Sequence, residues 1–334
     1  MILAGDIGGT KTALGLFSQE SGPDRPLTEG VFPSADHGSL EEITVDFLYQ
    51  ARSGPIEVAC FAVAGPILSD RAIVTNLPWT VQSSKLSMAL DIGKVKLIND
   101  VQAVASSIPF LGKSNLRTLN QGKPAATGTA AVIAVGTGLG EAFLTWSGSS
   151  YESFPTEGGH TDFAPGNERQ AGLLAFMNSK RSHVSWEVVC SGIGIPNIYD
   201  YLASTGNYRD TRLLMEIPGS TGNRTPAIID AALEGDPPCP LCADTLEMFI
   251  SILGAESGNL VLKTMATGGL YLGGGIPPRI LKALECNSFI EAFTAKGRLT
   301  PMMEDIPVHV ILNPKAALMG AAIEAIRMNQ ERQR

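Results

Sequence analysis

Positive charge is scarce in this sequence. Its 334 residues include 25 Lys and Arg against 33 Asp and Glu, which gives a net charge of −8. An acidic chain repels polyanions on average, and no basic stripe in the sequence reverses that repulsion. We therefore expect no nucleic-acid partner. A small anion is still a reasonable ligand, because backbone dipoles and a metal ion bind it locally.

Cysteine is also sparse. The five cysteines are an odd number and are scattered along the chain: Cys60, Cys190, Cys239, Cys242 and Cys286. That pattern argues against a disulfide framework and is typical of a reducing cytosol. Cys239 and Cys242 have the spacing of half a zinc site, but no second Cys or His pair completes it. We expect free thiols there rather than a metal.

Long apolar runs are missing. The longest, from Ala130 to Leu144, is interrupted by glycines and by Glu141, and it is too short to cross a bilayer. No basic segment precedes the apolar strand that begins at Ile2, so we expect no secretory signal, a cytoplasmic protein and no membrane partner. At 334 residues the chain is long enough for two domains, and its 44% of hydrophobic residues can form a sizeable core.

The common nucleotide motifs are absent as well. The glycine-rich stretch from Gly5 to Lys11 is neither a Walker loop nor a dinucleotide fingerprint. It lies between two apolar runs within residues 2–17, which predicts a β-hairpin. Glycines at its turn allow the backbone N–H groups to approach an anion closely. The alternative is an ordinary glycine-rich hairpin turn.

The residues of this turn supply the groups that a phosphate needs. Thr10 adds a hydroxyl donor and Lys11 a positive charge, whereas the Asp6 carboxylate would repel a phosphate. A Mg²⁺ ion with its waters, placed between the two anions, removes that conflict. We therefore expect these residues to bind a phosphate-containing cofactor, with Asp6 holding the metal through water: Asp6, Ile7, Gly8, Gly9, Thr10 and Lys11.

Residues 131–144 repeat the opening pattern of apolar run, Gly/Thr turn and apolar run. Two such hairpins, one in each half of the chain, suggest a pseudo-repeat whose turns, with Thr137 and Gly138, converge on one polyphosphate. Glu141 does not fit the apolar exit strand. Further on, Gly274 belongs to a glycine turn between a strand and a proline-containing helix start, which suits an adenosine or is simply a tight turn.

The last part of the chain predicts one more helix, over residues 314–326. It is rich in alanine and contains Gly320, so it should pack closely on its neighbour. The polar tail from Met328 onward is expected to fray.

Polar side chains follow the strand predicted at residues 95–98. Asn99 and Asp100 stand where this strand ends and a helix begins, which is where open α/β sheets hold their sites. Asp100 has two equally supported interpretations, a functional carboxylate and a helix N-cap.

A second polar group follows later in the chain. Glu157 and His160 flank two glycines, and Glu187 stands beside apolar neighbours. A lone histidine is more often structural than a ligand, and Glu187 is equally read as a solvated helix residue or an ion-pair partner. The pattern alone leaves these alternatives open.

Taken together, these motifs resemble those of bacterial glucokinases, in the hexokinase, actin and Hsp70 superfamily. The resemblance extends from residue 2 to about 325, and Asp162–Pro165 replaces the zinc motif of the related ROK sugar kinases, which favours the zinc-free branch. Lys11 stands where many members carry Asn. The motifs occur in the family's order: Gly5–Thr10, Leu97–Asp100, Gly136–Gly140, Glu157–His160, Glu187 and Leu272–Gly275.

The resemblance implies an α/β protein with the two-domain, actin-like ATPase (ribonuclease H-like) fold and a central cleft. The small domain would comprise residues 1–110 and 301–334, and the large domain residues 111–300. The sugar would lie in the cleft, with the nucleotide phosphates between the two hairpins. The family also implies a homodimer.

The implied activity is ATP-dependent phosphorylation of D-glucose at its 6-hydroxyl, with Mg²⁺. Asp100 would be the general base, and Thr137 and Gly274 would join the first hairpin in binding ATP. The implied sugar ligands are Asn99, Glu157, His160, Glu187 and Gly138. The alternatives are a kinase for another hexose or with another phosphoryl donor, and a non-catalytic sugar sensor on the same fold. We expect no room for the DNA-binding segment that such sensors add.

Overall fold

The computed structural model describes residues 1–74, 77–208, 224–236 and 239–333. Contacts within the chain divide it into two units. The first consists of Met1–Gly112, Ser147–Pro155 and the chain from Asn313 onward, and the second of Lys113–Trp146 and Thr156–Leu312. Residues 301–312 thus fall with the second unit rather than with the expected small domain, because the strand at Val308–Ile311 belongs to the second sheet. The domain assignment itself stays a prediction.

The first unit is built on a five-stranded sheet with the order β3-β2-β1-β4-β8. β1 pairs antiparallel with β2, which is the hairpin that the sequence predicts, and parallel with β4, which pairs parallel with β8. All six residues of β4 are buried, as its apolar sequence requires for a strand that lies between β1 and β8. The strands are β1 (Ile2–Ile7), β2 (Lys11–Phe17), β3 (Thr28–Pro33), β4 (Val58–Val63) and β8 (Lys94–Asn99).

Four α-helices and a small three-stranded sheet complete the described part of the first unit. The small sheet has the order β5-β6-β7. Ser39 caps the first helix by accepting a hydrogen bond from Glu42 N at 3.2 Å. These elements are α1 (Leu40–Gln50), α2 (Ser83–Leu90), α3 (Asp100–Ser107), α13 (Ala316–Gln333), β5 (Ile67–Leu68), β6 (Arg71–Ile73), β7 (Thr80–Gln82) and the 3₁₀ turns η1 (Ser34–Asp36) and η2 (Ile108–Phe110).

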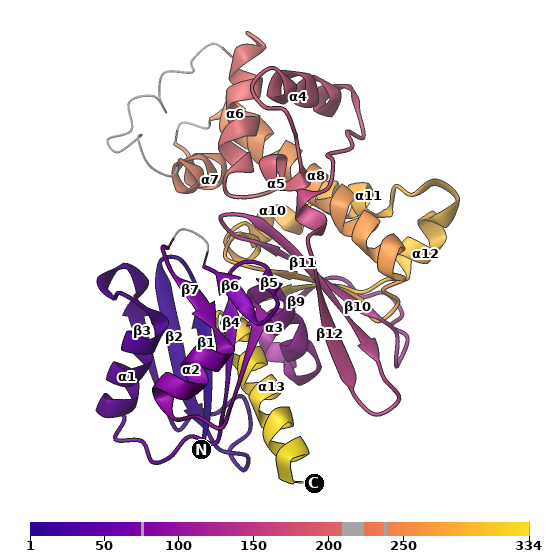
Figure 1. The fold of residues 1–334 in the computed structure, drawn as a ribbon. Helices are drawn as coiled ribbons and strands as arrows, with labels where there is room; N and C mark the ends of the chain where they lie inside the picture. Colours follow the sequence, from indigo (N-terminus) through magenta and orange to yellow (C-terminus); the bar gives the residue numbers. More distant parts are fainter. Residues whose placement is uncertain (75–76, 209–223, 237–238, 334) are drawn as a thin grey trace. The chain divides into compact units, whose positions relative to one another are not determined.

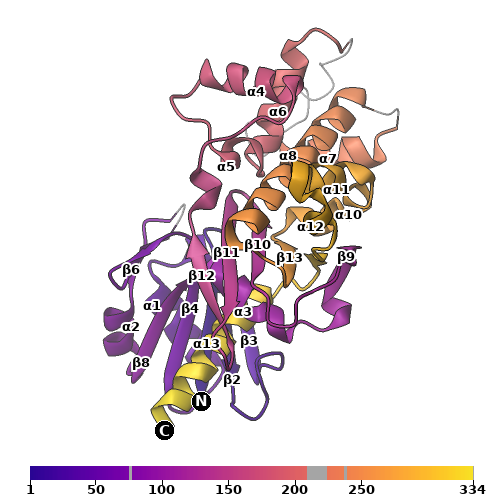
Figure 2. The ribbon, with the colours of Figure 1, turned by 90° about the vertical axis from the view of Figure 1, so that its right-hand side faces the viewer.

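Helix α13 packs on α3 and on strands β1 and β4 (Figures 1 and 2). A Cβ on Gly320 would overlap the carbonyl of Ala103, so the two helices cross at a glycine, as expected. The expectation that the tail frays from Met328 is wrong. The helix continues to Gln333, because Met328 and Asn329 are both buried.

The buried Glu324 ties α13 to two other elements of the first unit. Its carboxylate receives hydrogen bonds from Lys96 Nζ at 2.8 Å and from Ser106 Oγ at 3.0 Å. Burial alone raises the pKa of Glu324, but Lys96 and Arg327 outweigh it and hold the pKa below its usual value. α13 therefore carries an ionised carboxylate that fixes β8 and α3, the two elements that meet at Asn99 and Asp100.

The second unit is built on a six-stranded sheet with the order β12-β11-β10-β13-β14-β9, although the edge strand β12 is grouped with the first unit as far as Pro155. β10 and β11 form the second predicted hairpin, and β10, β13 and β14 run parallel. The strands are β9 (Leu116–Asn120), β10 (Ala130–Val135), β11 (Leu139–Trp146), β12 (Tyr151–Thr156), β13 (Gly269–Gly273) and β14 (Val308–Ile311).

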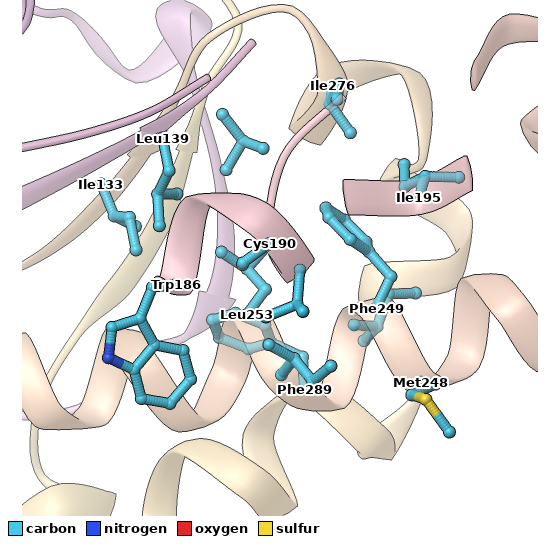
Figure 3. Close-up of a cluster of buried hydrophobic side chains, with 14 of the residues drawn as sticks. Ile133, Leu139, Trp186, Cys190, Ile195, Met248, Phe249, Leu253, Ile276 and Phe289 are labelled. Atoms are coloured by element: carbon cyan, nitrogen blue, oxygen red, sulfur yellow. The ribbon is translucent and has the colours of Figure 1, made fainter. Parts of the chain in front are cut away.

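Nine described α-helices belong to the second unit, and the long α8 packs on β10 and β13. Figure 3 shows Trp186 and Cys190 pointing toward Leu253 of α8 and Phe289 of α11 in one apolar cluster. The helices are α4 (Glu168–Asn178), α5 (Trp186–Val189), α6 (Gly194–Ser204), α7 (Thr225–Glu234), α8 (Pro240–Thr264), α9 (Ile276–Arg279), α10 (Leu281–Leu284), α11 (Asn287–Thr294) and α12 (Thr300–Glu304); the 3₁₀ turns are η3 (Lys113–Asn115), η4 (Gly158–His160) and η6 (Gly297–Leu299).

Within the described residues, no helix is both long and apolar enough to span a membrane.

Candidate active site

The turn between β1 and β2 is held in place by η1. Ser34 Oγ donates to Gly8 O at 2.8 Å, and Ser34 N donates to Thr10 O at 3.0 Å. Gly8 N donates to Lys11 O at 3.0 Å and closes the turn. Since the carbonyls of Gly8 and Thr10 are tied to Ser34, the turn has one fixed conformation, which an anion site made of backbone groups needs.

Asp6 lies one residue before the end of β1, in register with Ala13 and Ala62. Burial raises the pKa of Asp6 to about 6, and the positive charge of Lys11 lowers it in part. The described residues contain no group of three or more His, Cys, Asp or Glu side chains that could hold a metal. One partly buried carboxylate fits Mg²⁺, which keeps several waters and takes its other ligands from substrate phosphates.

The carboxyl ends of β1, β4 and β8 meet at one edge of the first sheet. Ile7 pairs with Val63, and Val63 pairs with Asn99. The strand register therefore places the phosphate turn and the Asn99–Asp100 pair at the same edge of the first unit, as expected for an α/β sheet.

Asn99, not Asp100, is the N-cap of α3. Asn99 Oδ1 accepts hydrogen bonds from Val101 N at 2.9 Å and Gln102 N at 3.1 Å, while Nδ2 donates to Gly65 O at 3.2 Å. The N-cap interpretation of Asp100 is therefore wrong by one residue. Two N–H groups and one carbonyl fix the Asn99 side chain, which leaves the second Nδ2 hydrogen for a ligand.

Asp100 is the first residue of α3 and is half-buried. Its Oδ1 accepts a hydrogen bond from Val101 N at 2.9 Å. A carboxylate in the first turn of a helix is stabilised in its ionised form by the helix dipole. The Asp100 carboxyl is thus held on a helix whose start is fixed by its neighbour.

In the second unit, two glycine turns lie against each other. Gly274 has φ +86°, and a Cβ there would overlap the carbonyl of Val135, the last residue of β10. The turn that follows β10 is closed by Gly136 N donating to Gly138 O at 3.0 Å, and Gly192 N donates to Gly136 O at 2.8 Å. The structure therefore brings Gly274 to the turn that carries Thr137 and Gly138.

Glu187 reaches this same turn from α5. Its Oε2 accepts a hydrogen bond from Leu139 N at 3.0 Å, and a Cβ on Gly138 would overlap that oxygen. Glu187 is half-buried in the first turn of α5, and no ion pair of its carboxylate occurs among the described residues. Gly138 is required because it admits the carboxylate. The remaining acceptor capacity of Glu187 suits a hydroxyl donor.

The turn that carries Glu157 and His160 lies against Leu139, the residue whose N–H donates to Glu187. A Cβ on Gly159 would overlap Leu139 O, so the turn η4 rests directly on the start of β11. His160 Nε2 lies 3.8 Å from Glu157 Oε2, and the two side chains are 59% and 60% exposed. The exposed ring of His160 argues against a core structural histidine. One residue, Leu139, therefore contacts both groups: its N–H donates to Glu187, and its carbonyl lies against Gly159 in the Glu157–His160 turn.

Sequence reasoning missed the groups that hold these side chains. Leu139 contributes through its backbone, which no residue type reveals, and Ser34 reaches Gly8 across 26 positions. The signal that was available is the Gly158-Gly159 pair, because two adjacent glycines beside charged residues indicate close backbone approach.

Comparison with known proteins bears on this arrangement. A profile of the glucokinase family matches residues 3–328. The chain belongs to the glucokinase family. Its relatives include the glucokinase of Trichormus variabilis, 41% identical over 98% of this chain and 99% of the relative, and that of Photorhabdus laumondii, 34% identical over 96% and 95%.

Solved structures agree with this family assignment. A glucokinase from an Antarctic psychrotroph superposes with a TM-score of 0.83 at 31% identity, covering 98% of both chains. A glucokinase from Balamuthia mandrillaris gives a TM-score of 0.80 at 22% identity, covering 97% of this chain and 93% of that one, and supports the fold alone. The resemblance and the actin-like two-domain α/β fold that the sequence predicts are confirmed.

Proposed function

We propose that this member of the glucokinase family transfers the γ-phosphoryl group of ATP to the 6-hydroxyl of D-glucose, giving glucose 6-phosphate and ADP. The observation that carries the proposal is the arrangement around Leu139, where an ionisable acceptor, Glu187, and the exposed pair Glu157 and His160 share one anchor. A sugar presents several hydroxyl donors, and a rigid set of acceptors is what recognises them.

Asp100 is the proposed general base. It accepts the proton of the 6-hydroxyl as that oxygen attacks the γ-phosphorus. Phosphoryl transfer depends mainly on the positioning of the reacting groups and little on covalent catalysis. The fixed position of Asp100 at the start of α3 would supply that orientation. Asn99, with its side chain already held by the helix start and Gly65 O, would donate its second Nδ2 hydrogen to the sugar.

The ATP phosphates are proposed to bind at the two glycine turns, residues 8–11 with Asp6 and Ile7, and residues 136–138 with Gly274 nearby. Backbone N–H groups and the Thr10 and Thr137 hydroxyls would donate to phosphate oxygens. Asp6 would hold Mg²⁺ through water, and the ion would neutralise charge on the phosphates. The side chain of Lys11, exposed on β2, is available to the same phosphates.

A panel of sugars and phosphoryl donors tests this proposal. We expect glucose with ATP to give the highest kcat/KM in a coupled assay. Mannose and galactose should lose roughly tenfold to a hundredfold, because an epimer would cover one of these acceptors without pairing it, at a cost of about 1–3 kcal/mol. Equal turnover of an epimer would contradict the choice of sugar, and a preference for ADP or polyphosphate would contradict the choice of donor. Sugar binding without turnover would indicate a sensor.

A further inference from the structure

Glu141 has a buried carboxyl group, and few neighbouring groups would stabilise a negative charge on it. It lies on β11, is 1% exposed, and its Oε1 has no hydrogen-bond partner among the described residues. An ionised carboxylate buried without partners is strongly destabilising. The apolar pattern of the strand does not explain the residue, so another feature of the structure must.

The carboxyl of Glu141 faces that of Glu256, which is fully buried on α8, and the two interact directly. Glu256 already has two partners, Lys263 Nζ at 3.2 Å and Asn259 Nδ2 at 2.8 Å. Two carboxylates this close do not both ionise, so one holds a proton. Since Glu256 has the cation and the amide, Glu141 is the one that stays neutral.

The other groups around the pair agree with this distribution of charge. Lys296 Nζ donates to Asn259 Oδ1 at 2.7 Å and so adds a second cation on the side of Glu256. Cys190, at the end of α5, is fully buried, and burial raises the pKa of its thiol so that it stays neutral. Burial and the charge of Glu256 raise the pKa of Glu141 to about 8.

Glu141 also touches the turn that carries Glu157 and His160. A Cβ on Gly158 would overlap Glu141 Oε2, so the carboxyl lies directly against the Cα of Gly158. We propose that Glu141 is a positioning residue of the sugar site: in its neutral form it shares a proton with Glu256 and supports the Glu157–His160 turn. Loss of that proton places a second negative charge under the turn and weakens glucose binding. This inference rests on the proposed function.

Titration calorimetry of glucose at pH 7 and pH 9, without nucleotide, tests the role of Glu141. We expect the Kd of the wild-type protein to rise several-fold at pH 9. Glu141→Gln keeps the shape and remains neutral, so its Kd should stay within twofold across this range. Glu285→Gln, which removes an exposed carboxylate paired with Arg117, is the matched control and should follow the wild type.

A second variant tests the same inference if Glu141→Gln folds poorly. Glu256→Gln removes the neighbouring charge, so Glu141 ionises more easily and the loss of affinity should begin at lower pH. Parallel loss of affinity in the wild type and Glu141→Gln would overturn the inference, as would a Kd of the wild type that does not change with pH. A wild-type protein that binds no glucose at any pH would instead contradict the proposed function.

A separate observation concerns Cys239 and Cys242. Cys239 is partly exposed and caps the 25-residue helix α8, with its Sγ accepting from Cys242 N at 3.4 Å. Cys242 is fully buried, and its Sγ lies 2.7 Å from that of Cys239. The two thiols therefore stand at the start of α8 within reach of each other, and burial raises the pKa of Cys242.

The geometry points to a dithiol that forms an intramolecular disulfide with a small disulfide oxidant of the glutathione type. The Cys239 thiolate attacks one sulfur of the oxidant, which releases one thiol and leaves a mixed disulfide. Cys242 then loses its proton, attacks Cys239 Sγ and releases the second thiol. The protein dithiol is oxidised by two electrons, and the oxidant is reduced to two thiols.

Thiol counting after incubation with oxidised glutathione tests this assignment, in a Cys286→Ser background that removes the exposed cysteine. We expect the denatured protein to lose two thiols and the intact mass to fall by two hydrogen atoms. Cys242→Ser should instead retain glutathione on Cys239. An unchanged thiol count, or a stable glutathione adduct in the presence of both cysteines, would overturn the assignment.

Discussion

At the residue scale, the candidate site depends on how a few backbone groups hold charged side chains. Asn99 caps α3 and thereby fixes Asp100 beside it, and Leu139 fixes Glu187 through its N–H. The sequence places an Asn and an Asp side by side, and both are good N-caps. Which of them caps the helix depends on where β8 ends, and pattern alone does not determine that.

Asp100→Asn tests the catalytic role of the carboxylate. The variant should fold and bind glucose normally, because the cap at Asn99 is untouched. Its kcat should fall on the order of 10²–10⁴-fold, since an amide accepts no proton. Asp91→Asn, at the exposed end of α2, is the control and should keep wild-type kcat. A folded, glucose-binding Asp100→Asn protein with near-normal kcat would refute the role of base.

Glu141 makes stability depend on pH. Its pKa is raised from about 4.5 to about 8 on folding, so the folded protein keeps a proton that the unfolded chain loses between these values. The free energy of unfolding should therefore be highest, for this group, below pH 4.5 and fall as pH rises toward 8, by up to about 1.4 kcal/mol per pH unit. Urea unfolding at pH 6, 7 and 8 should show a smaller fall in Glu141→Gln. Identical slopes in the two proteins would disprove the assignment.

At the element scale, the two hairpins and the strand-to-helix junctions follow from local sequence, because alternation of apolar runs with glycine turns specifies them. The parts that sequence reasoning missed depend on distant partners. Glu141 was unexplained because Glu256 lies more than a hundred positions away, and the tail beyond Met328 stays helical because it packs on a sheet formed by the start of the chain.

Gly320→Ala tests the crossing of α13 and α3. Alanine gains about 1 kcal/mol of helix propensity over glycine, but its Cβ would overlap the backbone of Ala103. Overpacking of this kind costs about 1–3 kcal/mol, so urea unfolding should show a net loss of stability. Gly112→Ala, where a Cβ meets nothing within 4 Å, is the control. Wild-type stability in Gly320→Ala would show that α13 shifts without cost.

At the scale of the whole molecule, the motifs that indicate the family are divided between the two units. Asp100, the proposed base, and the first proposed phosphate turn belong to the first unit, whereas Glu157, His160, Glu187 and the second proposed turn belong to the second. No single segment of the sequence contains all the proposed site residues. Six motifs in the family's order therefore indicated the family better than any one motif did.

The homodimer that the resemblance implies remains a prediction at this scale. Sedimentation equilibrium at micromolar concentration should give twice the 35.2 kDa mass of one chain. A mass of one chain across that range would exclude the dimer.

Formation of ADP by the purified chain, with and without glucose, tests the central claim most directly. With Mg²⁺ and ATP, and with no other protein present during the reaction, we predict that ADP and glucose 6-phosphate form in equal amounts and that ADP formation nearly stops when glucose is left out. ADP formed at the same rate without the sugar, or glucose bound with no ADP formed, would contradict the account.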